Sequence, residues 1–159
     1  NGADMVSLEV ENEHARIYAG IQAMRFDERI SVEYMPLPDS LRAWTVPRLI
    51  IQPLIENAFG HGLSAKQAGG LLRVSFFEDE DHIGIAVEDN SDQIDENRLV
   101  QLRGCLEKND PQEEITAIVN IHRRIKGVFG EKSGLFLSVS GLGGMKSEIV
   151  MQKHGGKGA

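Results

Sequence analysis

The chain has little cysteine and no long apolar run, and each shortage excludes a class of protein. One of its 159 residues is cysteine, so an internal disulfide framework is excluded and a reducing compartment is indicated. Apolar runs stay well short of the roughly 20 residues that a membrane-spanning helix needs, and no signal-peptide pattern is recognised. We therefore expect this segment to make no contact with a membrane.

Basic side chains are also scarce, with 17 Lys and Arg against 24 Asp and Glu and a net charge of −7. Binding to a phosphate backbone needs a basic face, so nucleic acid is not expected as a partner. The lone Cys105 lies in LRGCLEK, which favours a small apolar helix residue over a catalytic thiol. The hydrophobic fraction of 41% and the charged fraction of 26% are typical of one soluble globular domain.

The periodicity of the apolar residues predicts an α+β fold. Strands are expected at 30–37, 71–78 and 82–89 and in the segments GLFLSVS and MKSEIVMQ. Helices are expected over 7–26, from Thr45 through IIQPLIENAFGHG, over 95–108, and from Ile115 to Phe129. Because the strands come in hairpins with helices grouped between them, we expect a sandwich rather than a doubly wound parallel sheet.

Two of the expected helices have sequence features that predict a buried face in one and a kink in the other. The helix over 7–26 is amphipathic, and its expected apolar stripe consists of Leu8, His14, Ile17, Ile21 and Met24. In the helix that begins near Thr45, Pro53 would stand in the interior, where proline costs about 3 kcal/mol. We therefore expect a kink or a local break just before Asn57.

Asn57 is an amide in an otherwise apolar segment. On a helical wheel with about 100° per residue, it falls in the centre of a stripe, with His61 beside it and Glu56 on the flank; the stripe is Val46, Ile50, Pro53 and Leu54. A buried amide without partners costs roughly 1–3 kcal/mol. Either a neighbouring backbone group satisfies Asn57, or this face of the helix is one wall of a ligand site.

Asp89 raises the same question on a strand. Alternation places it on one face with Ile83, Ile85 and Val87, so its carboxylate points inward at the strand end and needs donors. In one interpretation DNSD is a turn in which Asp89 and Asn90 bond their own backbone. Two inward polar groups, one on a helix and one on a strand, favour the other interpretation, a pocket.

At this point the residues resemble a known family. The segment PRLIIQPLIENAFGHG is similar to the N-box of LytS/YesM-type sensor histidine kinases, which share a superfamily with gyrase, MutL and heat-shock chaperone ATPases. YAGIQAMRF, VEDNS and VNIHRRIKGVFG also resemble motifs of this family. The resemblance runs from about Leu8 to Met151 and is strongest at the N-box.

The resemblance implies the Bergerat-type ATP-binding sandwich, a mixed β-sheet with helices packed on one face. It divides the chain into three parts: the end of a dimerisation and phosphoacceptor helical segment (1–28), a histidine-kinase-like ATPase domain (29–152) and a disordered tail (153–159).

The resemblance also implies a role for each polar residue discussed above. The side-chain oxygen of Asn57 would bind Mg²⁺, which takes hard oxygen ligands, and His61 would face the phosphates. Glu56 would hold a water or polarise the attack, and Asp89 would accept a hydrogen bond from the adenine amino group. The remaining implied nucleotide-binding positions are Asn90, Asn120, Gly141 and Gly143.

The chain departs from the family pattern where the family has glycines. D-N-G-x-G reads DNSDQ, with Ser91 and Gln93; the lid motif G-I-G-L-x-N reads ITAIVN, with Ile115 and Ala117; and G-x-G-T reads GLGG, with Gly144 in place of threonine. If Ser91 needs a left-handed backbone, we expect strain of roughly 1–2 kcal/mol and weak ATP binding. We expect residues 92–114 to be mobile or to form an ordinary helix that does not close on ligand.

The family's phosphoacceptor is a His followed by Phe, and that context is missing around His14, His61, His82, His122 and His154. The resemblance therefore implies the catalytic ATP-binding domain of a sensor histidine kinase, which transfers a phosphoryl group from Mg·ATP to a histidine on an upstream segment not in this chain. It implies a response regulator as partner, a homodimer in the full-length protein, and a place on the cytoplasmic side of a membrane-anchored sensor. The alternative is a degenerate, non-catalytic module of the same fold that serves as a signalling or interaction scaffold.

Overall fold

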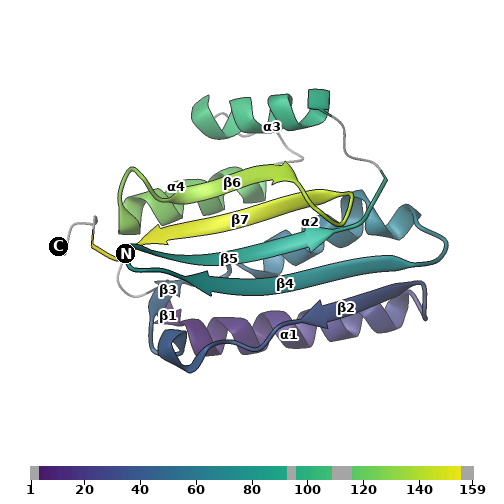
Figure 1. The fold of residues 1–159 in the computed structure, drawn as a ribbon, viewed down its shortest axis with the longest axis horizontal. Coiled ribbons are helices and arrows are strands. Elements are labelled where there is room, and N and C mark those ends of the chain that lie inside the picture. Colours follow the sequence, from purple (N-terminus) through teal and green to yellow (C-terminus); the bar gives the residue numbers. More distant parts are fainter. Residues whose placement is uncertain (1–3, 93–95, 109–115, 155–159) are drawn as a thin grey trace.

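The main sheet is mixed and has five strands in the order β2–β4–β5–β7–β6 (Figure 1). The structure, a computed structural model, describes residues 4–92, 96–108 and 116–154. Only the β2–β4 pair is parallel among the described strand pairs of this sheet. The strands are β2 (Ile30–Tyr34), β4 (Gly70–Glu78), β5 (His82–Asp89), β6 (Gly134–Val139) and β7 (Met145–Gln152).

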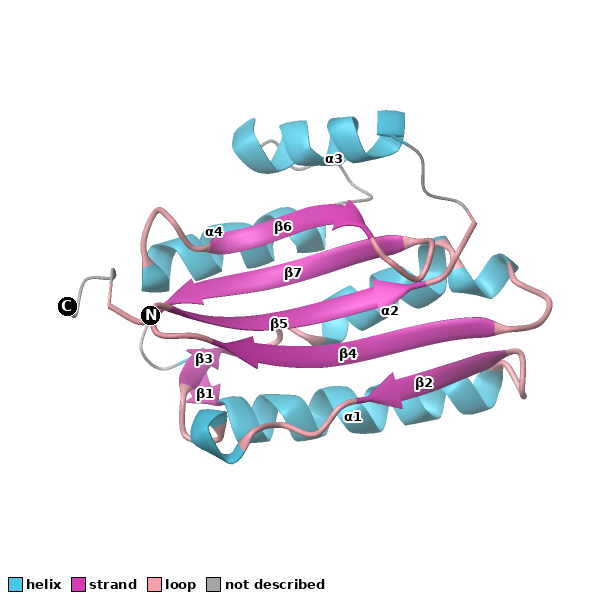
Figure 2. Ribbon diagram, viewed as in Figure 1, coloured by secondary structure: helices cyan, strands magenta, loops and turns pink. Residues whose placement is uncertain are grey.

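Three helices cover one face of this sheet, and a fourth lies along its edge (Figures 1 and 2). The three are α1 (Leu8–Arg25), α2 (Gln52–His61) and α4 (Thr116–Phe129). The fourth, α3 (Glu96–Lys108), packs against β6. The predicted α+β sandwich with a mixed sheet and helices on one face is confirmed.

Helix α3 protects the edge strand of the sheet. Its apolar face is buried, and the guanidinium of Arg103 donates from Nε to the carbonyl of Leu137 in β6 at 3.0 Å. The buried side chains are Leu99, Leu102, Cys105 and Leu106. An edge strand offers unpaired backbone groups to other chains, and α3 covers part of this edge. The prediction that Cys105 is an apolar helix residue is confirmed.

The two strand pairs expected from alternation are antiparallel pairs in the sheet. In β5 the residues predicted to face inward are buried, and β4 and β5 pair from Leu72 opposite Asp89 to Glu78 opposite Ile83. The β6–β7 hairpin turns through Ser140 to Gly144. A positive φ of 111° at Gly143 is the one place in this turn where glycine's freedom is needed.

The start of the N-box helix was predicted wrongly. The segment from Thr45 to Pro47 forms a short strand, β3, which pairs antiparallel with β1 (Met5–Ser7). Helix α2 begins only at Gln52, so Pro53 lies in its first turn and does not kink its interior. The first turn tolerates proline because its N–H groups have no partner inside the helix. Pro53 is thus the second residue of the helix, and a proline in the sequence is as compatible with this position as with an interior kink.

The buried face of α1 also differs from the prediction. Leu8, Glu11, Ala15 and Ala19 point inward, whereas Ile17, Ile21 and Met24 are 51%, 54% and 77% exposed. Alanine at the contact positions brings the helix close to its neighbours, and the larger side chains then remain outside. The helix packs on both α2 and β2, and Phe26, just beyond its end, stacks on Phe59 of α2.

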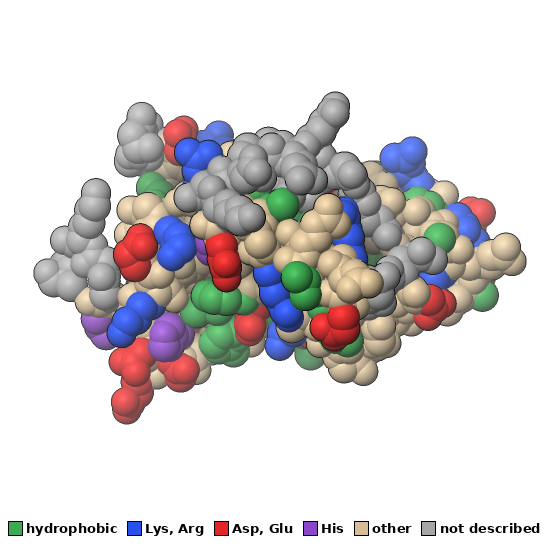
Figure 3. All heavy atoms as spheres, turned by 90° about the horizontal axis from the view of Figure 1, so that it is seen from above, with side chains coloured by type: hydrophobic (Ala, Val, Ile, Leu, Met, Phe, Trp, Pro, Cys, Tyr) green, Lys and Arg blue, Asp and Glu red, His purple; other side chains and the backbone are tan. Residues whose placement is uncertain are grey.

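The core lies between the sheet and the helices on its inner face. Trp44, just before β3, stacks on Phe129 of α4 with ring centroids 5.7 Å apart. Figure 3 shows Lys and Arg side chains mixed with Asp and Glu, with no continuous basic surface among the side chains coloured on that face. No helix in the described parts of the chain is long and apolar enough to cross a membrane.

Candidate functional site

Helix α2 presents Asn57 at the flank of its buried face. The buried side chains are Leu54, Ile55, Ala58 and Phe59, while Asn57 is half-buried and Glu56 is exposed. The predicted position in the centre of an apolar stripe is therefore wrong, because Val46 and Ile50 precede the helix and cannot share its wheel. Because the Asn57 side chain is half-buried at the flank of the helix, it is accessible both to a bound ligand and to water. His61 is the last residue of the helix, and its side chain lies outside what the structure describes.

Asp89 ends β5 with a buried carboxylate, 4% exposed. Its Oδ1 accepts hydrogen bonds from the backbone N–H of Ser91 at 3.0 Å and of Met145 at 3.3 Å. The bond from Ser91 is the local turn contact that one interpretation predicts for Asp89. The bond from Met145 comes from a distant segment and is not part of a local turn. Among the described residues, no donor lies on Oδ2. That oxygen is the acceptor which the carboxylate can offer to a ligand.

Three segments converge around Asp89. The N–H of Gly144, in the β6–β7 turn, donates to the Asp89 carbonyl at 3.0 Å. A Cβ built on Gly144 would lie 1.9 Å from Asp89 Oδ1, and one built on Gly62, just after α2, would lie 2.5 Å from the Ser91 Cβ. The two glycines therefore let the turn and the end of α2 approach the end of β5 closely.

The expected strain at Ser91 is absent. Asp27 and Leu49 are the non-glycine residues with positive φ in the described parts of the chain, so Ser91 does not occupy the left-handed region. Its side chain is buried against Gly62 instead. Of the other departures from the family pattern, Ala117 is exposed on α4, and Gln93 and Ile115 lie outside the described residues.

The other candidate nucleotide-binding residues differ in whether they are exposed and whether their side chains already make hydrogen bonds within the protein. The Asn90 side chain is committed to the backbone, since Oδ1 accepts from the N–H of Leu71 and Nδ2 donates to the carbonyl of Gly69, both at 2.8 Å. Asn120 is exposed in the first half of α4, and Gly141 and Gly143 are exposed in the β6–β7 turn. The assignment of all four to a ligand stays a prediction.

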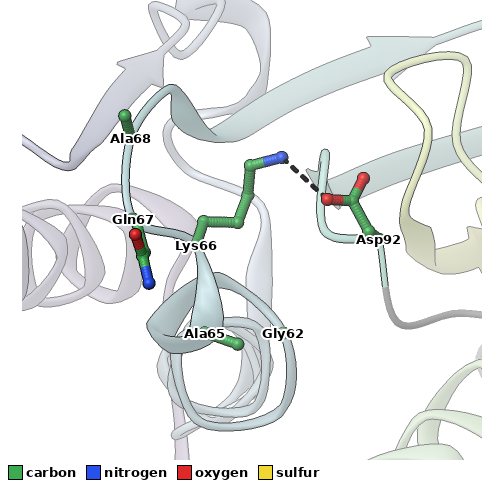
Figure 4. A pocket seen from close by; sticks show the side chains of 6 residues that line it. All are labelled: Gly62, Ala65, Lys66, Gln67, Ala68 and Asp92. Atoms are coloured by element: carbon green, nitrogen blue, oxygen red, sulfur yellow. Dashed lines mark hydrogen bonds and ion pairs between the residues drawn. The ribbon is translucent and has the colours of Figure 1, made fainter.

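A cavity of about 430 Å³ adjoins this region beyond the end of α2 (Figure 4). Lys66 Nζ extends across it to the Asp92 carboxylate at 3.4 Å and to the Asn90 carbonyl at 3.2 Å. The remaining lining residues are Gly62, Ala65, Gln67 and Ala68. The ion pair connects the loop after α2 to the loop after β5, so it helps to keep the two main site segments together.

Two residues that hold the site were not found from the sequence. Glu11 of α1 accepts three backbone N–H groups just before α2, and Arg124 of α4 donates to two carbonyls of the same loop. The signal for Glu11 was its spacing, because it shares the helical face of Leu8, Ala15 and Ala19. A charged residue on a buried face needs partners.

The residues present fit a nucleotide that carries a magnesium ion. Within the described residues, no group of three His, Cys, Asp or Glu side chains is placed to hold a metal. Magnesium needs no such group, since it commonly keeps waters and binds substrate phosphates together with one or two protein oxygens. Asn57 offers one oxygen at the flank of α2, and Asp89 offers an oriented acceptor at the floor of the site.

Comparison with known proteins finds relatives whose similarity extends over most of the chain. No family model matches. The chain is 31% identical over 153 residues to the sensor protein LytS of Bacillus anthracis, which covers 96% of this chain and 26% of that protein. It is 27% identical over 128 residues to the sensor histidine kinase YpdA of Escherichia coli, with 80% and 22% covered. The chain thus spans about a quarter of the length of these curated relatives.

Solved structures share the fold. The ATP-binding domain of PrrB from Mycobacterium tuberculosis matches with a TM-score of 0.61 and 19% identity, over 94% of this chain and 97% of that one. The histidine kinase ThkA in complex with the response regulator protein TrrA matches with a TM-score of 0.62 and 10% identity, over 94% and 41%.

Proposed function

From its similarity to LytS-type sensor histidine kinases over almost the whole chain, we propose that this chain belongs to that family and is the catalytic ATP-binding domain of a larger sensor protein. It transfers the γ-phosphoryl group of ATP to a histidine on a segment outside the chain. The observation that carries this proposal is the convergence of α2, Asp89 and the Gly144 turn at one end of the sheet.

The base of the nucleotide is selected by Asp89 in this proposal. Its Oδ1 is held by two backbone N–H groups, which fixes the carboxylate and leaves Oδ2 as an acceptor. The amino group of adenine is a donor that suits this oxygen, whereas guanine carries a carbonyl at the equivalent edge. Two oxygens facing each other would repel, so the site favours ATP over GTP.

The phosphate end of the site belongs to α2. Asn57 provides a side-chain oxygen for Mg²⁺, and the ion, when bound, neutralises charge on the transferring phosphoryl group. Glu56, exposed one residue earlier, holds a water or polarises the attack. His61 faces the phosphates, and Asn90, Asn120, Gly141 and Gly143 complete the nucleotide-binding set.

The partners of the whole protein follow from the same proposal. A response regulator accepts the phosphoryl group from the histidine, as ThkA is seen in complex with the regulator TrrA. The full-length protein is a homodimer, and this domain lies on the cytoplasmic side of a membrane-anchored sensor.

Titration of the chain with ATP, with and without Mg²⁺, tests the proposal. We expect Asn57→Ala to weaken Mg·ATP binding by at least about tenfold, which corresponds to about 1.4 kcal/mol, and to leave unfolding unchanged because the residue is half-buried. The control is Glu80→Gln, an exposed residue in the turn between β4 and β5, at the opposite end of β5 from Asp89. Equal affinity of Asn57→Ala and the parent chain would remove Asn57 from the site.

The base is tested in the same titration. The parent chain should bind ATP more tightly than GTP, and Asp89→Asn should reduce that preference. A chain that binds no nucleotide with or without Mg²⁺ would contradict the kinase proposal and favour the scaffold alternative.

A further inference from the structure

The loop from Arg48 to Ile51, which we name the pre-helix loop, leads directly into α2. Leu49 has a φ of 59°, in the left-handed region that a leucine rarely occupies. Such a conformation persists only where the surroundings hold it. The N-cap residue Ile51 provides no side-chain hydrogen bond to the helix. The start of α2 is therefore held by something outside its own sequence.

The Glu11 carboxylate supplies that support. It is buried in α1, 3% exposed, and far along the chain from the loop that it contacts. Oε1 accepts the N–H of Leu49 at 2.9 Å, and Oε2 accepts those of Ile50 at 2.8 Å and Ile51 at 3.1 Å. Ile51 is the N-cap, and the first N–H groups of a helix have no partner inside it, so a negative charge is favoured there. The N–H groups of Leu49 and Ile50 belong to the loop itself, and Glu11 pairs them too.

The opposite side of the same loop is held by α4. The Arg124 guanidinium donates to the carbonyl oxygens of Leu49, at 3.3 Å, and of Arg48. The carboxylate on α1 thus takes the loop's N–H groups, and the guanidinium on α4 takes its carbonyls. The N–H of Arg48 donates to the carbonyl of Asp4 at 2.9 Å, which continues the β1–β3 pairing.

We propose that Glu11 is a positioning residue for the nucleotide site: it fixes where α2 begins and thereby where Asn57 faces. This inference rests on the proposed function, because it assigns Asn57 to Mg·ATP. A shift of the helix by one residue relative to the elements that it packs on turns its side chains by about 100°, and the three N–H groups held by Glu11 oppose such a shift. Asn57 lies only six residues after Ile51, at the flank of the helix, so a change at the loop moves it away from a ligand.

Glu11→Gln is the sharpest variant, because it keeps the size of the side chain. Both carboxylate oxygens accept N–H groups, so in either orientation the new NH₂ faces a donor and at least one bond is lost. Glu9→Gln is the matched control on the same helix, since Glu9 is exposed and pairs with Arg42 at the surface. Arg124→Gln tests the other side of the loop, with the exposed Arg123→Gln as its control.

Hydrogen exchange gives a readout that needs no nucleotide. In Glu11→Gln, amides from Leu49 to Asn57 should exchange at least about tenfold faster, while amides of the β4–β5 pair should keep the parent rates. Glu9→Gln should match the parent throughout. Uniform acceleration across the sheet would mean that Glu11 only stabilises the fold. Unchanged exchange in the pre-helix loop would overturn the proposal that Glu11 holds this loop.

A double-mutant cycle then separates positioning from stability. Under conditions where all variants are folded, Glu11→Gln should weaken Mg·ATP binding at least about fivefold in the parent background and by less than about twofold in Asn57→Ala. Equal losses in both backgrounds, or no loss in either, would overturn the proposal. A parent chain that binds no Mg·ATP would refute the proposed function and the positioning role with it. The exchange result would still show whether Glu11 holds the pre-helix loop.

Discussion

The imidazole of His122 shows how a single buried residue can make the stability of this protein depend on pH. Its Nδ1 accepts the backbone N–H of Leu135 at 2.9 Å, so the neutral form is the one that this contact requires. Burial, and secondarily the charge of Lys126, lower the pKa of His122 below its ordinary value. A lowered pKa in the folded state means that the unfolded chain binds the proton more readily.

We therefore expect the free energy of unfolding to be highest above about pH 6.5, the ordinary histidine pKa, and to fall as the pH is lowered through the pKa of folded His122. Denaturant unfolding between about pH 8 and pH 5 measures this. In His122→Asn the Oδ1 can replace Nδ1 as the acceptor of the Leu135 N–H. The part of the pH-dependent fall in unfolding free energy that comes from His122 should then disappear. The exposed His14→Asn should keep the parent profile, and a His122→Asn profile equal to the parent's would remove His122 as the source.

At the scale of the element, the β6–β7 turn offers a comparison of two nearby glycines. A Cβ on Gly144 would lie 1.9 Å from Asp89 Oδ1 and 2.7 Å from the Ser91 nitrogen, whereas one on Gly141 meets nothing within 4 Å. Gly144→Ala should destabilise the protein by about 1–3 kcal/mol, as overpacking does, and should weaken nucleotide binding because it displaces Asp89. Gly141→Ala should leave stability close to that of the parent. Thermal unfolding of both variants measures the contrast, and equal melting temperatures would contradict the close approach.

The five strands of the main sheet were predicted from the sequence because alternation depends on local burial, whereas the short strands β1 and β3 were missed. Residues 82–89 alternate so regularly that both the strand and the inward Asp89 could be inferred, and Asp89 is buried in the structure. The buried faces of the helices were harder to predict from the sequence than the strands. In α1 the large side chains Ile17 and Ile21 suggested the wrong face, since close packing against neighbouring elements favours Ala15 and Ala19. That preference depends on distant segments, which periodicity does not contain.

The start of α2 could not be predicted for a related reason. Pro53 is compatible with a kinked interior and with a first turn, and the choice depends on β1, which pairs with β3 from a distant part of the sequence. Glu11 and Arg124 contact the pre-helix loop from 38 and 75 residues away. Local sequence gave the polar residues of the site, whereas the residues that hold them are defined by tertiary contacts.

For the whole molecule, the distribution of histidines bears on where the phosphoryl group goes. His122 is buried and committed to Leu135, and His82 lies beside Asp79 at the far end of β5 from Asp89. His14 and His154 are exposed, on α1 and after β7. His14 lies outside the converging segments around Asp89, as do His82 and His122. In the proposed function His61 belongs to the nucleotide site itself, so the phosphoryl group goes to a histidine that another segment presents.

We therefore expect no stable phosphohistidine on the chain alone when it is incubated with Mg·ATP labelled at the γ-phosphate. Positioning supplies most of the rate in phosphoryl transfer, and an acceptor outside the site gains none of it. A longer form that carries the acceptor segment should become labelled, and Asn57→Ala in that form should abolish labelling. Base-stable, acid-labile phosphate on the short chain, retained in Asn57→Ala, would indicate a contaminating kinase. The same label lost in Asn57→Ala would show that the acceptor lies within these 159 residues.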